Sequence, residues 1–158
     1  MAISSLYVDP TLACVYVGVI GQLQDADYVA AFQAVLAHPD RRPEFAEVWN
    51  FLEVTGLAFT PEVLAAYRGL MQRYEGDDVL TRGRIAVLAK QEDIRTMTVL
   101  FDKISSGYVN RQIELFRDTA RAEAWLSLPT GTFSTLQQTI PVVQISAQGP
   151  LPPKRKAS

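Results

Sequence analysis

The sequence contains little of what catalytic and metal sites usually require. It has one cysteine, Cys14, and one histidine, His38, among 158 residues. A single cysteine excludes an internal disulfide and a cysteine metal cluster, and a single histidine excludes a site built from several histidines. Any Ser-His-Asp or Cys-His unit would have to use His38. We therefore predict no catalytic, cofactor-binding or metal-binding residue and a protein that is not an enzyme.

The sequence also lacks a strong charge of one sign and a long apolar run. The chain has 15 Lys and Arg against 17 Asp and Glu, a formal net charge of -2. Without a dense basic stripe we expect no nucleic-acid binding. The longest apolar stretch, around residues 12–20, is far shorter than the ~20 residues of a membrane span, and the amino terminus has no signal-peptide pattern. We predict a cytoplasmic protein with no membrane span.

The few candidate residues for chemistry have structural interpretations. His38 precedes Pro39 at a predicted helix end, where it suits a cap partner better than a catalytic base. Cys14 lies within a predicted strand, where cysteine is commonly a small buried hydrophobe. Three acidic pairs suit solvated charges near helix starts better than a shared ion. These pairs are Asp25 with Asp27, Asp77 with Asp78, and Glu92 with Asp93.

Hydrophobic residues make up 48% of the chain and charged residues 20%, as in globular domains. Residues 3–8 and 12–20 are β-branched and aromatic runs around an Asp-Pro-Thr turn, which predicts a hairpin. Further strands are predicted over 48–54, 84–89 and 109–116, with amphipathic helices after residues 24, 60, 90 and 118. The order predicts an α/β fold with a mixed, mostly parallel five-stranded sheet, an N-terminal hairpin and about four helices.

The composition changes near residue 128. Residues 128–158 are rich in Thr, Ser, Gln, Gly and Pro and end with Lys154, Arg155 and Lys156 before the last two residues. Such a segment buries too little apolar area to offset the entropy of ordering it. We predict one domain over residues 1–127 and a flexible C-terminal tail over 128–158. Residues 140–145 are the exception, a short β-prone patch that can add to a sheet edge here or in a partner.

Several spaced features carry a family resemblance over about residues 6–126. They are the hairpin that runs into Gly21, the segment Asn-Phe-Leu-Glu-Val-Thr-Gly-Leu at 50–57, the strand at 84–88, and Leu-Phe-Arg-Asp at 115–118 followed by Trp125 and Leu126. In this order the chain resembles the SpoIIAA-like proteins of the STAS/SEC14-like group. The resemblance implies a mixed sheet covered by helices and no known catalytic apparatus.

The resemblance also implies one regulatory position. In the anti-sigma-factor antagonists of this fold, a hydroxyl residue at the mouth of the helix after the third strand is phosphorylated, which controls partner binding. The matching position here is Thr55. The chain lacks the antagonists' Asp-Ser pair, has Asn50 and Glu53 nearby, and has a longer turn to Thr60. A threonine in such a turn also suits a capping role, so both interpretations stay open.

Two functional hypotheses follow. The first is a non-catalytic regulatory or protein-interaction module that binds an unidentified protein through Thr55, Gly56, Leu57 and Thr60. The alternative is a carrier with a SEC14-like pocket for a small apolar or lipid ligand, and a homodimer through an exposed sheet edge is a further option. The pocket would be lined by aromatic residues that otherwise form the core: Trp49, Phe51, Tyr67, Tyr74, Phe101, Tyr108 and Trp125.

Overall fold

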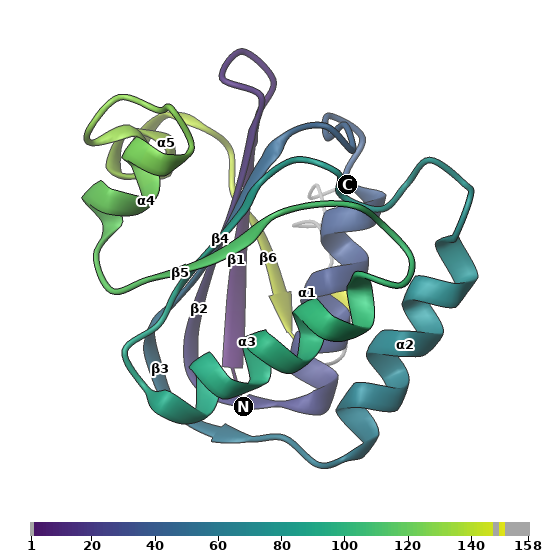
Figure 1. Cartoon of the computed structure of the whole chain (residues 1–158). Coiled ribbons are helices and arrows are strands. Elements are labelled where there is room, and N and C mark those ends of the chain that lie inside the picture. Colours follow the sequence, from purple (N-terminus) through teal and green to yellow (C-terminus); the bar gives the residue numbers. More distant parts are fainter. Residues whose placement is uncertain (1, 147–148, 151–158) are drawn as a thin grey trace, which may run out of the picture.

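A computed structural model describes residues 2–146 and 149–150. In this part of the chain one mixed sheet has the strand order β5-β4-β3-β2-β1-β6-β7, with helices on both faces (Figure 1). The elements are β1 Ala2–Asp9, β2 Cys14–Gln24, α1 Asp25–Ala37, β3 Ala46–Ala58, α2 Glu62–Tyr74, β4 Ile85–Leu88, α3 Glu92–Ser105, β5 Ile113–Phe116, α4 Thr119–Trp125, α5 Thr132–Thr139, β6 Val143–Ser146 and β7 Gly149–Pro150.

The first nine elements confirm the predicted order and fold class. β1 and β2 form the antiparallel hairpin, whose turn projects at the top of Figure 1. In this turn the Asp9 side chain accepts hydrogen bonds from the Thr11 and Leu12 amides at 2.9 and 3.3 Å. β2, β3, β4 and β5 are parallel neighbours, and each connection between them contains a helix. The four strands therefore run in one direction, as right-handed crossovers require.

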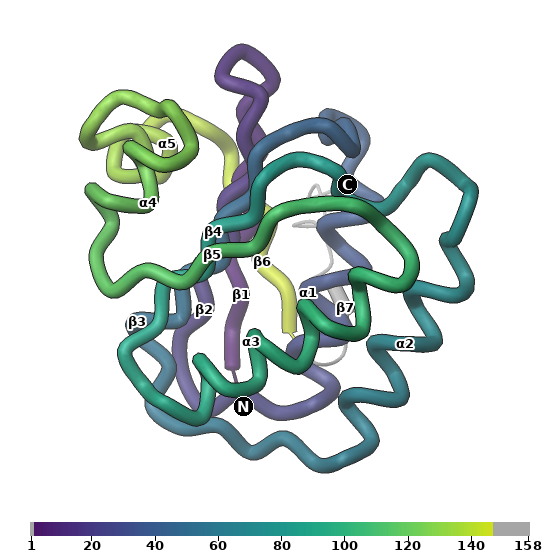
Figure 2. Tube along the Cα trace, viewed as in Figure 1, coloured from purple at the N-terminus to yellow at the C-terminus, as the bar shows by residue number. Residues whose placement is uncertain are grey.

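The two faces of the sheet carry different helices. α1, α2 and α3 cover one face, where residues such as Val17, Trp49 and Val87 point into a large aromatic core. α4 and α5 cover part of the other face, where Tyr16 and Leu88 pack against them. Figures 1 and 2 show the two helix groups on opposite sides of the strands. All four residues of β4 are buried because both of its faces are covered.

Residues 128–150 add elements beyond the predicted five strands and four helices. Phe133 and Leu136 of α5 are each 1% exposed against the sheet, and Ile145 of β6 is equally buried. β6 pairs antiparallel with β1 and so extends the sheet at the patch predicted from residues 140–145. Residues 151–158, with the three terminal basic residues, lie outside the described part. The flexibility of the segment stays a prediction.

Strand lengths differ from the sequence prediction at the carboxyl ends of β2 and β3. β2 does not end at Gly21 but continues to Gln24, with Gly21 at a φ of 104° and a register shift on either side. β3 continues to Ala58, because residues 22–24 of β2 pair with residues 56–58. The first residue of α1 is Asp25, and Asp27 rather than Asp25 caps the helix by accepting from the Gln24 amide at 2.9 Å.

Candidate functional site

The predicted interaction residues lie on β3 and in the connection to α2. Thr55, Gly56 and Leu57 belong to the strand itself, which corrects the predicted strand-to-helix turn. The cause is the extended pairing with β2, which places Gln22 opposite Gly56 and Leu23 opposite Leu57. Thr55 is exposed, whereas Gly56 and Leu57 are half-buried. Their role in binding a partner stays a prediction.

Thr60 is exposed and joins two helices at their amino ends. Its amide donates to Asp25 Oδ1 at 2.9 Å, and its hydroxyl donates to Asp25 Oδ2. The N-cap position of α2 is Pro61, and this helix has no side-chain cap. The hydroxyl is committed to α1 instead. Segment 55–60 is therefore fixed to α1 at one end and to β2 at the other.

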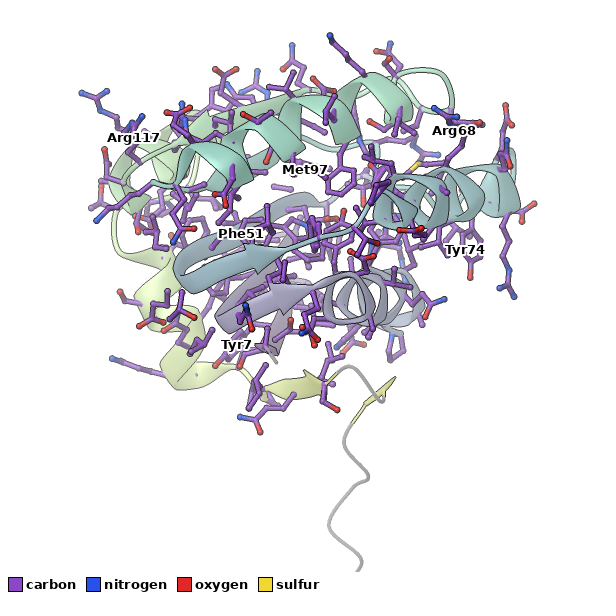
Figure 3. The ribbon with its side chains drawn as sticks, turned by 90° about the horizontal axis from the view of Figure 1, so that it is seen from below. Tyr7, Phe51, Arg68, Tyr74, Met97 and Arg117 are labelled. Carbon is purple, nitrogen blue, oxygen red and sulfur yellow. The ribbon has the colours of Figure 1, made fainter. Side chains whose placement is uncertain are left out.

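A cavity of about 50 Å³ lies between the sheet and α1, α2 and α3, directly behind this segment. Leu57 and Phe59 form part of its wall. Figure 3 shows Met97 on the side of α3 that faces the sheet layer carrying Phe51. The lining is mostly aromatic and aliphatic, and includes Leu23, Tyr28, Phe32, Glu47, Trp49, Phe51, Leu57, Phe59, Tyr67, Ile85, Val87, Ile94, Met97, Thr98, Phe101, Arg111 and Ile113.

Tyr28 of α1 lies at the centre of the aromatic lining. Its ring stacks on Phe101 with centroids 4.9 Å apart and planes inclined by 8°, and Phe101 stacks in turn on Tyr67 at 4.6 Å. Trp49 and Phe59 contact Tyr28 at 5.6 and 5.9 Å. Pairs of this geometry stabilise a core beyond the area that they bury.

A buried polar network closes the end of the cavity near the amino ends of the parallel strands. Glu47, 2% exposed, accepts from Trp49 Nε1 and from the Thr81 hydroxyl, each at 2.6 Å. Thr81 in turn accepts from the Arg41 guanidinium at 2.7 Å. Burial lowers the pKa of Arg41, and the nearby Glu47 carboxylate opposes that shift. The threonine thus connects a buried cation to a buried anion.

Arg111 adds a second guanidinium to this end of the cavity. It donates to the Tyr67 hydroxyl at 2.8 Å and to the Thr81 carbonyl at 3.2 Å. Burial raises the pKa of Tyr67, so the phenol stays neutral and accepts this bond through its oxygen. Within the described residues, the buried Nε atoms of Arg111 and Arg41 have no hydrogen-bond partner. Neither guanidinium forms an ion pair in that part of the chain.

The single cysteine is fully buried, and the single histidine is half-buried. Cys14 is fully buried between β1, β3 and the α4–α5 face, and burial raises its pKa to about 12. His38 is the C-cap of α1, and its Nδ1 accepts from the Asp40 amide at 3.1 Å. Burial lowers the pKa of His38, and the Asp40 carboxylate opposes the shift. Neither residue lines the cavity.

The described residues include no group of three or more His, Cys, Asp or Glu side chains placed to hold a metal ion. In the same residues, no helix is both long enough and apolar enough to cross a bilayer.

Sequence reasoning found part of the cavity lining and missed its polar end. Of the aromatic residues named as pocket candidates, Trp49, Phe51, Tyr67 and Phe101 line the cavity. Tyr74 and Tyr108 border another surface depression, and Trp125 packs on Phe116 at the other sheet face. Glu47, Arg41, Thr81 and Arg111 were not candidates. The only available signal was a charged residue, Glu47, next to an apolar strand.

The arrangement is that of a helix-covered α/β sheet with an aromatic cavity on one face. A comparison with protein-family models finds no match, and a comparison with curated proteins finds none either. A crystal structure of an uncharacterized DUF3478-family protein with a SpoIIAA-like fold from Shewanella loihica PV-4 matches with a TM-score of 0.44 and 16% identity, over 71% of this chain and 82% of that one. The unphosphorylated anti-sigma factor antagonist SpoIIAA matches with a TM-score of 0.43 and 15% identity, over 77% and 94%. The names of both proteins refer to SpoIIAA, and the sequence resemblance predicts the SpoIIAA-like fold.

Proposed function

We propose that the protein is a non-catalytic regulatory module that binds a protein partner through segment 55–60. One observation carries the proposal: Leu57 and Phe59 line the cavity from this segment, while Thr55 and Thr60 are exposed on it. A ligand that displaces Leu57 or Phe59 would therefore act on the same short segment that carries the exposed Thr55 and Thr60. This is the physical requirement for a surface whose binding is regulated from within.

The full burial of Cys14 and the position of His38 outside the cavity support the non-catalytic part of the proposal. Thr55 supports the regulatory part, because a phosphate on an exposed strand residue adds about two negative charges without entering the core. The charge would oppose docking of an apolar surface at Leu57.

Site-specific photo-crosslinking in the native host tests the partner surface. A benzophenone amino acid is placed at Thr55 or, as a matched control, at Thr135, which is exposed on α5. We expect a discrete crosslinked protein from position 55 that is absent from position 135 and is lost when the Thr60→Glu change is added. Identical products from both positions, or none from position 55, would contradict the proposal.

The cavity favours a second candidate function, a carrier of a small apolar ligand. Its volume of about 50 Å³ is a third of the ~150 Å³ cavity that admits benzene. A ligand must therefore displace side chains, and Met97 is the most adaptable of the partly exposed lining residues. Native mass spectrometry of gently purified protein is expected to show a small adduct that a Met97→Trp variant lacks. An adduct retained by that variant would contradict binding in the cavity.

A further inference from the structure

The polar end of the cavity carries more positive charge than the described residues around it balance. The buried guanidinium of Arg41 and the half-buried guanidinium of Arg111 lie near a single buried carboxylate, that of Glu47. Glu44 also influences Arg41, but it is exposed and lies in an ion pair with Arg82. The cluster is therefore one negative charge short of neutrality.

The hydrogen-bond pattern indicates which residue would bind an added anion. Both oxygens of Glu47 already have a donor, so this carboxylate is satisfied by Trp49 and Thr81. Arg111 uses its two terminal nitrogens on Tyr67 and Thr81, and its buried Nε has no partner among the described residues. A buried donor left unpaired is costly, and a charged acceptor offsets that cost best. Arg111 also lines the cavity, which Arg41 does not.

The rest of the cavity suits an apolar body. From Glu47 and Arg111 the lining continues along β3 through Trp49 and Phe51 to Leu57 and Phe59. The stacked rings of Tyr28 and Phe101 lie beside this path and line the cavity. A molecule with one anionic end and one planar apolar end would match both regions.

We propose that the cavity binds a small aromatic carboxylic acid, with its carboxylate on Arg111 and its ring among Tyr28, Phe101 and Trp49. The inference rests on the cavity being a ligand site. The carboxylate neutralises the cluster and accepts from Arg111, while the ring takes the place of the unbranched Met97 side chain, which can adopt another rotamer. Because the open volume is about 50 Å³, the ligand is restricted to a single ring, which enters only when a lining side chain such as Met97 moves.

Binding of phenylacetate and of the neutral phenylacetamide tests the inference. Titrations are followed by the fluorescence of Trp49 in a Trp125→Phe background and by the Nε–H resonance of Arg111 in NMR spectra. We expect phenylacetate to bind at least about tenfold more tightly than the amide and to shift the Arg111 resonance. We expect Arg111→Gln to remove this preference while leaving amide binding within about threefold.

Two variants keep the test decisive if Arg111→Gln folds poorly. Arg111→Lys retains the positive charge and is expected to keep part of the preference for phenylacetate. Arg117→Gln, an exposed arginine that pairs with Glu92 away from the cavity, is expected to bind both probes like the wild type. An equal effect of Arg111→Gln and Arg117→Gln would overturn the role of Arg111.

The outcomes separate the inference from the function on which it rests. If both probes bind equally and Met97→Trp abolishes both, the cavity is a ligand site and the proposed carboxylate specificity is wrong. If neither probe binds, or if Met97→Trp leaves binding unchanged, the cavity is not the ligand site and both proposals fail. If phenylacetate is preferred and only Arg111→Gln removes that preference, both stand.

Discussion

Trp49 and Glu47 lie two residues apart on β3 and point to the same face of the sheet, where the indole Nε1 donates to a carboxylate oxygen at 2.6 Å. Both side chains are buried, with 5% and 2% of their surface exposed. The pair therefore joins the aromatic lining of the cavity to the Arg41–Thr81 network. The same carboxylate is the only negative side chain that lines the cavity among the described residues.

We expect Glu47→Gln to lower the free energy of unfolding by about 3 kcal/mol, because it leaves two guanidiniums without their buried counter-charge. Trp49 and Thr81 donate to different oxygens of Glu47, and the amide replaces one of these oxygens with an NH2 group, so one donor loses its acceptor. Urea unfolding measures the change. Glu53→Gln, at an exposed position of the same strand, is the control and is expected to cost less than about 0.5 kcal/mol. Equal losses for the two variants would contradict the role given to Glu47.

Thr60→Val is expected to destabilise the protein by about 1 kcal/mol, because it removes the hydroxyl that donates to Asp25. Thr55→Val is the matched control on the same segment. Thr55 is exposed and β-branched within a strand, so the change to valine is expected to be nearly neutral. Thermal unfolding of both variants compares them. A larger loss of stability for Thr55→Val than for Thr60→Val would show that Thr60 is not the residue that fixes the segment.

The order of elements could be predicted from the sequence because apolar, β-branched runs alternate with longer segments that have helix start and stop signals. The extension of β3 beyond Val54 could not be predicted. Thr55 and Gly56 have the local chemistry of a turn, yet β2 pairs with Val54 and Gly56, so β3 stays extended with Thr55 as the extra residue between the two pairs. Tertiary pairing here overrides a local turn signal. The position of Leu57 in the cavity wall follows from that pairing.

The polar end of the cavity could not be predicted for a different reason. Arg41, Thr81 and Arg111 lie in three connections that precede β3, β4 and β5. Each is an unremarkable loop residue by its own sequence context. They meet only because parallel strands bring the amino ends of β3, β4 and β5 to one edge, which is a property of the topology. Glu47 was likewise hidden, since β3 was predicted to start at Val48.

The single histidine allows a clean test of pH dependence. Burial lowers the pKa of His38 in the folded state below its usual value of about 6.5, so the unfolded chain takes up the proton first as the pH falls. The stability is therefore expected to decrease from about pH 7 to about pH 5.5. In this window a His38→Gln variant should show a flatter profile, because the chain has no other histidine. An increase in stability on acidification would mean that folding raises the pKa of His38, which contradicts the prediction. Urea unfolding across the window measures it.

Two valine-to-isoleucine changes on the same face of the sheet test whether the cavity is a true void. Val87 lines it, whereas Val17 of β2 is fully buried in the same aromatic core and does not. Val87→Ile adds one methylene where about 50 Å³ is open, and we expect it to raise the free energy of unfolding by up to about 1 kcal/mol.

Val17→Ile adds the same group where there is no space, and a loss of about 1 to 3 kcal/mol is expected from overpacking. Val87→Ile should also weaken phenylacetate binding, because the added methylene occupies the volume that the ring needs. Urea unfolding and the fluorescence titration measure the two effects on the same samples. If both valine variants lose the same stability, the space beside Val87 is filled in solution, and the ring of a ligand must then enter by moving α3 rather than by using an existing void.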